Sequence, residues 1–150
     1  MYEHERIFKE KPDGSFKPFA IFADTEPSAI EWIQDSSMRD FYDTSDMIYG
    51  REDTSNIFAN GYYNAGWKII EPIMERIRQT AEEYGRISDI LLYNSFSGGS
   101  GSALASLLLP RLKSEFTRNG SAAINLFPSE KGGVTEPYNT ILSIHRIWSE

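Results

Sequence analysis

The residues best suited to chemistry form a loop rich in glycine and serine, with the sequence SFSGGSGS at positions 95–102. The apolar run 87–93 precedes this loop, and a largely apolar segment, 103–110, follows it. Open α/β sheets bind their ligands at loops of this kind, between a buried strand and the next helix. The first turn of such a helix presents free backbone N–H groups and a positive dipole end to an anion. The loop is therefore interpreted as either a phosphate site or a tight turn, and its residues alone favour neither.

The glycines of this loop match neither of two well-known nucleotide-binding patterns. A Walker-type loop requires Gly-Lys-Ser or Gly-Lys-Thr, and no lysine follows the glycines here. The dinucleotide pattern requires a third small residue where this chain has Leu104, which disfavours an NAD-dependent oxidoreductase. A flexible linker is also disfavoured, because both flanks of the loop are apolar. Other parts of the chain must decide what the loop does.

Composition and charge narrow the classes of protein. The 150 residues are 40% hydrophobic and 13% aromatic, which predicts one globular domain of ordinary size. A formal net charge of -7 argues against binding to nucleic acid, and the lack of cysteine excludes disulfides and thiol chemistry. Apolar runs such as 103–110 are too short to cross a bilayer, and residues 1–16 lack the apolar centre of a secretory signal. We therefore expect a cytoplasmic protein with neither a membrane nor a nucleic acid as partner.

Apolar patterning predicts strands and helices that alternate along the chain. Continuous apolar runs are typical of buried strands in parallel sheets. They occur at 19–23, 87–93 and 122–127. Helical periodicity marks a short segment after Pro27 and three longer segments, at about 56–84, 101–116 and 136–148. This alternation predicts an α/β fold, with a Rossmann-like parallel sheet flanked by helices.

The segments between and inside these elements carry further expectations. Residues 12–14, Pro-Asp-Gly, predict a turn, and the polar residues 35–54 predict an acidic loop. Pro72 lies inside the long helix, where it removes a hydrogen bond, so we expect a bend or two helices there. Pro110 occupies a similar place in the next helix. The apolar side of the last helix consists of Ile141, Leu142, Ile144 and Ile147.

Five motifs, in order along the chain, resemble the tubulin family. Residues 94–102 resemble the signature GGGTGSG and its HSF lead-in, although Ser97 and Ser100 replace a glycine and the threonine, and Ala103 replaces a further glycine. The other four are FADTEP at 22–27, GREDTSN at 50–56, the long-helix residues 69–78, and EPYNTIL at 136–142. FADTEP resembles the family's VDLEP turn, and GREDTSN resembles the GKEDAAN loop of α-tubulin. Residues 69–78 resemble the long helix that follows this loop, and EPYNTIL resembles EPYNSIL. The resemblance covers about 19–146 and is closest to α-tubulin.

The resemblance implies that the glycine loop binds GTP. The residues that would wrap its β- and γ-phosphates are Gly98, Gly99, Ser100 and Gly101. Ser95 would contact the nucleotide from the same loop, and Asp53 and Asn56 would help to position the phosphates and the ion. Glu136 would accept hydrogen bonds from the ribose hydroxyls. Each acidic or amide residue also has a structural interpretation, because Asp53 and Asn56 suit a helix cap and Glu136 suits a helix N-terminus.

The resemblance also implies a magnesium ion near the γ-phosphate. Asp24 and Glu26 would lie beside this ion, although both are equally well explained as acids of a turn and a first helical turn. Carboxylate oxygens suit Mg²⁺, which usually keeps several water ligands. We expect no catalytic residue in this chain, because the family hydrolyses GTP at interfaces between subunits.

Parts of the family's domain have no match in this chain. Only 23 residues precede Asp24, and they contain no first strand with a glycine loop. The residues that hold guanine in the family follow the last helix, and they also have no match. We therefore expect residues 1–150 to be a partial, incomplete tubulin/FtsZ-type GTPase domain that needs further sequence or a complementing chain. A missing central strand would leave a gap between 19–23 and 87–93, with exposed apolar edges.

The leading interpretation is a tubulin-like, GTP-binding subunit of microtubules, or a fragment of one. It places the chain in the cytoplasm and cytoskeleton, with GTP and magnesium as cofactors and other tubulin subunits as partners. The alternative is a degenerate tubulin-like scaffold or interaction protein that does not turn over nucleotide. Ser97, Ile57 and the two helix prolines favour this alternative, because they depart from the family pattern.

Overall fold

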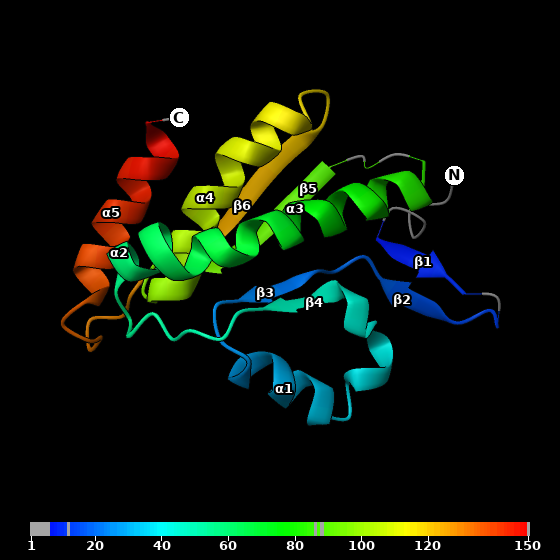
Figure 1. Ribbon diagram of the computed structural model, residues 1–150, viewed down its shortest axis with the longest axis horizontal. Helices are drawn as coiled ribbons and strands as arrows, with labels where there is room; N and C mark the ends of the chain where they lie inside the picture. Colours follow the sequence, from blue (N-terminus) through cyan, green and yellow to red (C-terminus); the bar gives the residue numbers. More distant parts are fainter. Residues whose placement is uncertain (1–6, 12, 86, 88, 150) are drawn as a thin grey trace.

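The strands in the described part of this protein form three separate pairs within an α/β fold (Figure 1). The computed structural model describes residues 7–11, 13–85, 87 and 89–149. The antiparallel pair is β1 (Phe8–Glu10) with β2 (Phe16–Pro18), and the parallel pairs are β3 (Phe22–Asp24) with β4 (Met47–Tyr49) and β5 (Asp89–Ser95) with β6 (Gly120–Leu126). The α/β prediction is confirmed, but the described parallel strands form two pairs rather than one sheet.

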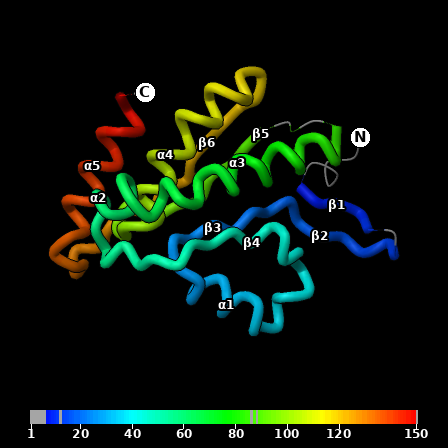
Figure 2. Tube along the Cα trace, in the orientation of Figure 1, coloured from blue at the N-terminus to red at the C-terminus, as the bar shows by residue number. Residues whose placement is uncertain are grey.

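Five α-helices surround these strands in the part of the chain that is described. They are α1 (Ser28–Asp35), α2 (Phe58–Asn60), α3 (Gly66–Glu83), α4 (Gly99–Glu115) and α5 (Glu136–Trp148). A π-helical turn, Gly61–Ala65, joins α2 to α3, and two 3₁₀ turns, Arg39–Phe41 and Thr44–Asp46, precede β4. Figure 2 follows the chain from the β1–β2 hairpin at one end of the molecule to α5 at the other.

The hydrophobic core lies where α3 packs against α4. Both helices turn an apolar stripe toward this contact, and Met74 of α3 is fully buried. The remaining buried members of the core are Ile69, Ile70, Ile73, Ile77, Leu104, Leu107, Leu108 and Leu112. Ile90 and Leu92 of β5 pack against this cluster from the sheet. The core therefore joins the two helices to one face of the β5–β6 pair.

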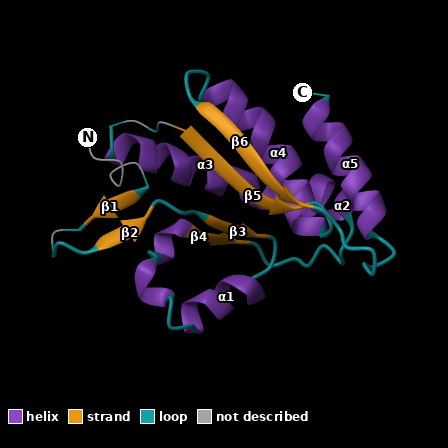
Figure 3. Cartoon of the chain, turned by 180° about the vertical axis from the view of Figure 1, so that it is seen from behind, coloured by secondary structure: helices purple, strands orange, loops and turns teal. Residues whose placement is uncertain are grey.

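The other face of the β5–β6 pair has no helix over it within the described residues. Figure 3 shows the pair from this side, with α3 and α4 behind it. Its apolar side chains are open to solvent, and their exposed fractions are 52% for Leu91, 68% for Tyr93, 45% for Ile124 and 67% for Leu126. Parallel sheets are normally covered on both faces. This face is therefore suited to pack against further polypeptide.

The first half of the chain contains more strand than the sequence predicts. The expected acidic loop 35–54 holds strand β4, and the largely polar segment 8–18 forms the β1–β2 hairpin. Strand β3 begins at Phe22, whereas the apolar run begins at Phe19. Short strands of three residues take their conformation from the strand they pair with, so local patterning does not reveal them. Gly14, with φ of 80°, confirms the expected turn, although Pro12 lies outside the described residues.

The second half matches the expectations more closely. Helix α4 begins at Gly99, two positions before the predicted start, and α5 coincides with the predicted segment 136–148. Strands β5 and β6 lie close to the expected runs, although part of the expected start at 87–89 lies outside the described residues.

Neither internal proline interrupts its helix. Helix α3 continues through Pro72, and α4 continues through Pro110, so the prediction of two helices at Pro72 is wrong. Both Pro72 and Lys68 are exposed. Water can therefore satisfy the Lys68 carbonyl, which loses its helical partner. The irregularity of the long helix lies instead at the π-helical turn Gly61–Ala65.

Helix α5 leaves two of its four predicted apolar side chains exposed, and the other two, Ile144 and Ile147, are half-buried. Ile141 and Leu142 are 66% and 44% exposed, whereas Asn139, Thr140 and Ser143 are buried. The buried polar groups bond to backbone carbonyls and to serines of α4, which a hydrophobic face cannot do. The docking of α5 is therefore governed by hydrogen bonds.

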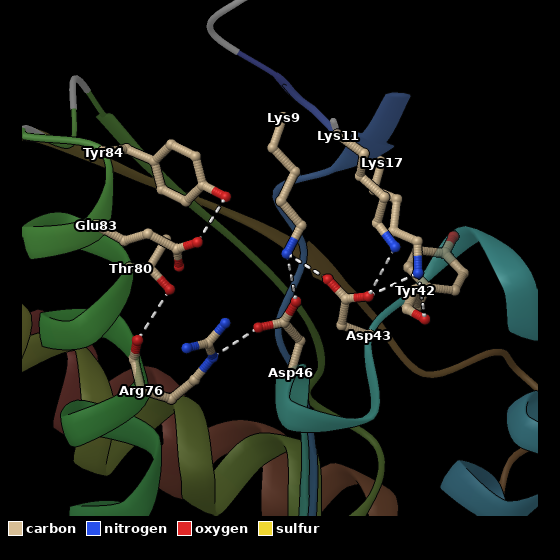
Figure 4. Close-up of polar contacts among 10 residues, drawn as sticks. All are labelled: Lys9, Lys11, Lys17, Tyr42, Asp43, Asp46, Arg76, Thr80, Glu83 and Tyr84. Carbon is tan, nitrogen blue, oxygen red and sulfur yellow. Dashed lines mark hydrogen bonds and ion pairs between the residues drawn. The ribbon is translucent and has the colours of Figure 1, made fainter. Parts of the chain in front are cut away.

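A cluster of charged side chains ties the β1–β2 hairpin to the rest of the fold (Figure 4). Lys9 Nζ lies 2.7 Å from Asp43 Oδ2 and 3.2 Å from Asp46 Oδ2, and Lys17 Nζ lies 2.6 Å from Asp43 Oδ1. Arg76 Nε of α3 donates to Asp46 Oδ1 at 2.6 Å. The side chains of Lys9 and Asp46 are only 9% and 7% exposed. Because Asp46 directly precedes β4, the cluster anchors the start of that strand.

The charged cluster predicts a loss of stability in acid that depends on Asp43. Hydrogen bonds from Lys17 and Lys9 hold the pKa of Asp43 well below its usual range. A lowered pKa in the folded state stabilises the protein above the unfolded value of about 4, and this contribution is lost as pH falls toward the folded pKa. We expect Asp43→Asn to lower the free energy of unfolding by about 2 kcal/mol at neutral pH. The difference between this variant and the wild type should shrink below about pH 4, as measured by urea unfolding.

Asp40→Asn is the matched control, because Asp40 is 87% exposed and its ion pair is with the exposed Arg39. It should change the free energy of unfolding by less than about 0.5 kcal/mol at any pH. An Asp43→Asn effect that stays constant down to pH 2 would contradict the assignment.

Candidate functional site

The start of α4 is an uncapped helix N-terminus at the carboxyl end of a parallel strand. Strand β5 ends at Ser95, and the helix begins at Gly99. Gly98 occupies the capping position, and no side chain bonds to the helix there. The first N–H groups of a helix have no acceptor within it, so those of 99–101 are available to an anion. The predicted order of strand, loop and helix is confirmed, and its geometry suits phosphate.

Close packing explains most glycines in and near this loop. A β-carbon on Gly99 would lie 2.5 Å from Thr54 Oγ1 and 2.6 Å from the Ile57 nitrogen. A β-carbon on Gly61 would lie 2.5 Å from the Gly99 oxygen and 2.7 Å from Ala103 Cβ. Only a chain without side chains at these points can bring α2 and the π-helical turn against α4.

Gly98 is different, because it faces open space. The nearest atom to a β-carbon there would be Asn56 Oδ1, at 3.9 Å. Packing therefore does not require glycine at this position. The space beside Gly98 is where an anion could approach the first N–H groups of α4.

Three hydroxyl groups bring separate loops together beside this helix start. Ser100 Oγ lies 2.6 Å from Thr25 Oγ1 and 3.5 Å from Thr54 Oγ1. Thr25 and Thr54 are 1% and 2% exposed. Thr25 sits between the predicted metal residues Asp24 and Glu26, so this contact places both acids near the start of α4.

The predicted metal residues are engaged with their own turn. Asp24 Oδ1 accepts a hydrogen bond from the Thr25 N–H at 2.7 Å, and Glu26 Oε1 accepts one from Ser28 Oγ at 2.7 Å. Within the described residues, no group of three or more His, Cys, Asp or Glu side chains is placed to hold a metal ion. Mg²⁺ in nucleotide sites usually takes one or two carboxylates together with phosphate and water oxygens.

The loop that carries Asp53 and Asn56 packs against the same helix start. Asp53 Oδ1 accepts from the Ser55 N–H at 2.8 Å, which forms a local turn. Ser55 and Asn56 both have left-handed backbones, with φ of 52° and 54°. Asn56 Nδ2 donates to Thr135 Oγ1 at 2.8 Å, so this loop reaches the residue before α5.

Glu136, the predicted ribose ligand, stabilises the start of its own helix. Its Oε1 accepts a hydrogen bond from the Gly133 N–H at 2.8 Å. A carboxylate in the first helical turn also interacts favourably with the helix dipole. This geometry matches the structural interpretation, and contact with ribose remains a prediction.

Asn139 is a buried polar residue at the centre of the site that the sequence pattern does not single out. Its side chain is 2% exposed and bonds to three backbone groups, from two loops and α2. The only signal in the sequence is its place as the fourth residue of the EPYN motif. Burial of a polar side chain in a helix whose exposed side is apolar would have identified it, but that requires the tertiary structure.

The structure gathers the predicted residues around the start of α4. The glycine loop lies at the centre, and hydrogen bonds link it to the other loops as described above. The residues concerned are Asp24, Glu26, Asp53, Asn56, Ser95, Gly98, Gly99, Ser100, Gly101 and Glu136. Of these, Ser95 Oγ accepts a hydrogen bond from the Ser97 N–H at 3.1 Å. Their contacts with a ligand remain predictions.

Comparison with known proteins gives a consistent result across the chain. The model of the Tubulin/FtsZ family, GTPase domain, matches residues 1–150. A tubulin alpha chain from Encephalitozoon hellem is 38% identical over 143 residues, which cover 94% of this chain and 38% of that protein. The tubulin alpha-1 chain of Schizosaccharomyces pombe is 35% identical over 141 residues, covering 93% and 31%. Human tubulin alpha chain-like 3 is 34% identical over 143 residues, covering 94% and 32%. The chain thus spans about a third of the length of these curated relatives.

None of the described helices is both long and apolar enough to cross a membrane.

The packing around Gly61 gives a prediction about stability. In Gly61→Ala, the added methyl group would overlap the Gly99 oxygen and Ala103 Cβ, so the π-helical turn and α4 must move apart. We expect the free energy of unfolding, measured with urea, to fall by about 1–3 kcal/mol. Gly133→Ala is the control, because its nearest contact would be an ordinary 3.6 Å from Glu136 Oε1. Equal stability of the two variants would contradict the close approach of the helices.

Proposed function

Because this chain belongs to the Tubulin/FtsZ family, we propose that it binds the phosphates of GTP at the start of α4. One observation carries the proposal, namely the uncapped N-terminus of α4 beside the open space at Gly98. Backbone N–H groups at such a helix start bind phosphate without any cationic side chain. This mode suits an acidic chain whose glycine loop lacks lysine.

Each residue of the site has a proposed task in holding the nucleotide. The N–H groups of 98–101 and the hydroxyl of Ser95 contact the phosphate side, and Glu136 accepts hydrogen bonds from ribose. Asp53 and Asn56 orient the phosphates from the neighbouring loop. Mg²⁺ neutralises phosphate charge when it is bound, and Asp24 and Glu26 hold it through water molecules. The donor set fits this ion, because one or two carboxylates and phosphate oxygens are its usual ligands in nucleotide sites.

The chain is further proposed to be part of a subunit of microtubules in the cytoplasmic cytoskeleton. This proposal rests on relatives that are named tubulin alpha chains and of which it spans about a third. Its partners would be other tubulin subunits. Hydrolysis of GTP would then occur at interfaces between subunits, so no residue of this chain is proposed as catalytic.

We also propose that residues 1–150 are a partial nucleotide-binding domain. The described strands of the two parallel pairs do not hydrogen-bond to each other, as expected if a strand between them is missing. The exposed face of the β5–β6 pair and the exposed Ile141 of α5 supply apolar surface for the remainder to cover. Further sequence, or a complementing chain, would supply the missing strand and the guanine-binding residues.

A second candidate function, a scaffold without bound nucleotide, is favoured by one set of contacts. Glu136, Asn56 and Asp53 already bond to groups of the protein. Ile57, where the family often has a second asparagine, is 46% exposed and offers no polar contact. A site whose polar groups are satisfied internally has less to offer a ligand.

Substitution of Gly98 tests the nucleotide proposal without disturbing the packing. Gly98→Ala adds only a β-carbon, whose nearest contact would be Asn56 Oδ1 at 3.9 Å, and it leaves the first N–H groups of α4 free. Gly98→Asp instead caps these N–H groups and places a negative charge where phosphate would bind. We expect Gly98→Asp to weaken the binding of Mg²⁺-GTP about 100-fold, and Gly98→Ala by less than about 5-fold. Isothermal titration calorimetry measures the affinity of each variant for Mg²⁺-GTP. The measurement is made on residues 1–150 and on the longest translated product that contains them.

Two outcomes would count against the nucleotide site. Equal affinities of the two Gly98 variants would show that the anion does not lie at the start of α4. No saturable binding of Mg²⁺-GTP by the wild type in either form would overturn the proposal and leave the scaffold.

The partial-domain proposal predicts that the isolated chain associates through the exposed face of β5–β6. The double variant Tyr93→Lys, Leu126→Lys places charge on this face, so it should shift the chain toward the monomer in analytical ultracentrifugation. The control is Thr117→Lys, Ser129→Lys, which adds the same charge at exposed positions outside the two strands. A wild-type chain that is monomeric and unfolds cooperatively would contradict the proposal.

A further inference from the structure

Asn139 uses its whole side-chain amide to connect three backbone segments. Its Oδ1 accepts a hydrogen bond from the Phe58 N–H at 2.9 Å. Its Nδ2 donates to the Asn56 oxygen at 2.9 Å and to the Ser97 oxygen at 2.8 Å. One amide group therefore joins α5 to the 53–56 loop, to the start of α2 and to the glycine loop.

We propose that Asn139 is a positioning residue that orients the phosphate-binding N–H groups of the glycine loop. The peptide bond between Ser97 and Gly98 is planar and trans, so its C=O and N–H point in opposite directions. Because the Ser97 carbonyl points at Asn139, the Gly98 N–H points away from α5. Asn139 thus directs this donor without touching the ligand. The inference rests on the proposed function, because the N–H group matters only if an anion binds.

The same side chain determines where the second loop lies. Ser55 and Asn56 adopt left-handed backbones, which cost energy in residues with side chains. The bond from Asn139 to the Asn56 oxygen, together with the bond from Phe58, holds the chain immediately after this turn. The Asn56 side chain can then reach the space beside Gly98.

No other side chain of similar size can make this set of bonds. Aspartate has no N–H donor and would place a negative charge against two carbonyl oxygens. Leucine would leave a buried N–H and two carbonyls without partners. Serine is too short to reach all three groups, although it leaves room for a water molecule.

A purely structural role for Asn139 can be separated from a positioning role by comparison with Ser143. Ser143 is fully buried on the same face of α5, and its hydroxyl donates to the Ser102 oxygen at 3.1 Å. Hydrogen bonds join it to Ser102 and Ser106, both of which lie in α4. Loss of Ser143 should therefore weaken the docking of α5 without altering the glycine loop.

The test compares Asn139→Ser and Asn139→Asp with Ser143→Ala. Titration with Mg²⁺-GTP should show affinity lowered about 10- to 100-fold in both Asn139 variants, and by less than about 2-fold in Ser143→Ala. Amide hydrogen exchange followed by NMR, without nucleotide, should show faster exchange at Phe58 in Asn139→Ser, because serine is too short to accept from the Phe58 N–H. The rate there should rise more than the rate at amides of the α3–α4 core. Asn139→Ser carries the test if the charged variant does not fold.

The outcomes separate this inference from the proposed function. If the wild type fails to bind Mg²⁺-GTP, the proposed function is overturned and the positioning of an anion donor falls with it. If the wild type binds, equal losses of affinity in Asn139→Ser and Ser143→Ala would overturn the positioning role alone. Unchanged exchange at Phe58 in Asn139→Ser would also overturn it.

Discussion

The backbone of the 58–66 segment lies directly against the start of α4, and this close contact shapes both the core and the candidate site. Glycine at 61, 66 and 99 removes the side chains that would keep the 58–66 segment and the start of α3 away from α4. The helices can then share one apolar core, and the loops at their starts meet. A methyl group added at Gly61 would overlap the carbonyl oxygen of Gly99, which is the first residue of α4 and belongs to the candidate site. Core packing and the candidate anion site therefore depend on the same contact.

Hydrogen bonds from polar side chains then determine how the other segments join this contact. Thr25, Thr54 and Ser100 link the end of β3 and the 50–56 loop to α4 through hydroxyl groups. Asn139 links α5 to the same place. At the far end of α3, Arg76 and the charged cluster hold the hairpin and the start of β4. Buried polar groups are costly when unpaired, so each of these links favours one arrangement of its loop.

Apolar side chains are exposed to solvent on the β5–β6 pair and on α5. The β5–β6 pair has helices on one face and exposed apolar side chains on the other. Helix α5 turns Ile141 outward while its polar groups face the site. Among the described strands, the two parallel pairs do not join. These features support the proposal that further polypeptide packs against this chain, which spans about a third of the length of its relatives.

Helical periodicity and glycine runs are local signals, so they were enough to predict the α/β class, the strand–loop–helix around the glycines and the limits of α5. The resemblance to tubulin, based on motifs alone, is confirmed by the family match. Strand β4 has no such local signal, since its three residues depend on pairing with β3. The burial of Asn139 rather than Ile141 in α5 is also set by tertiary contacts, because the partners of Asn139 at Phe58 and Ser97 lie far away in the chain. Hydropathy measures the cost of contact with water, and it carries no information about which distant carbonyl will satisfy a buried amide.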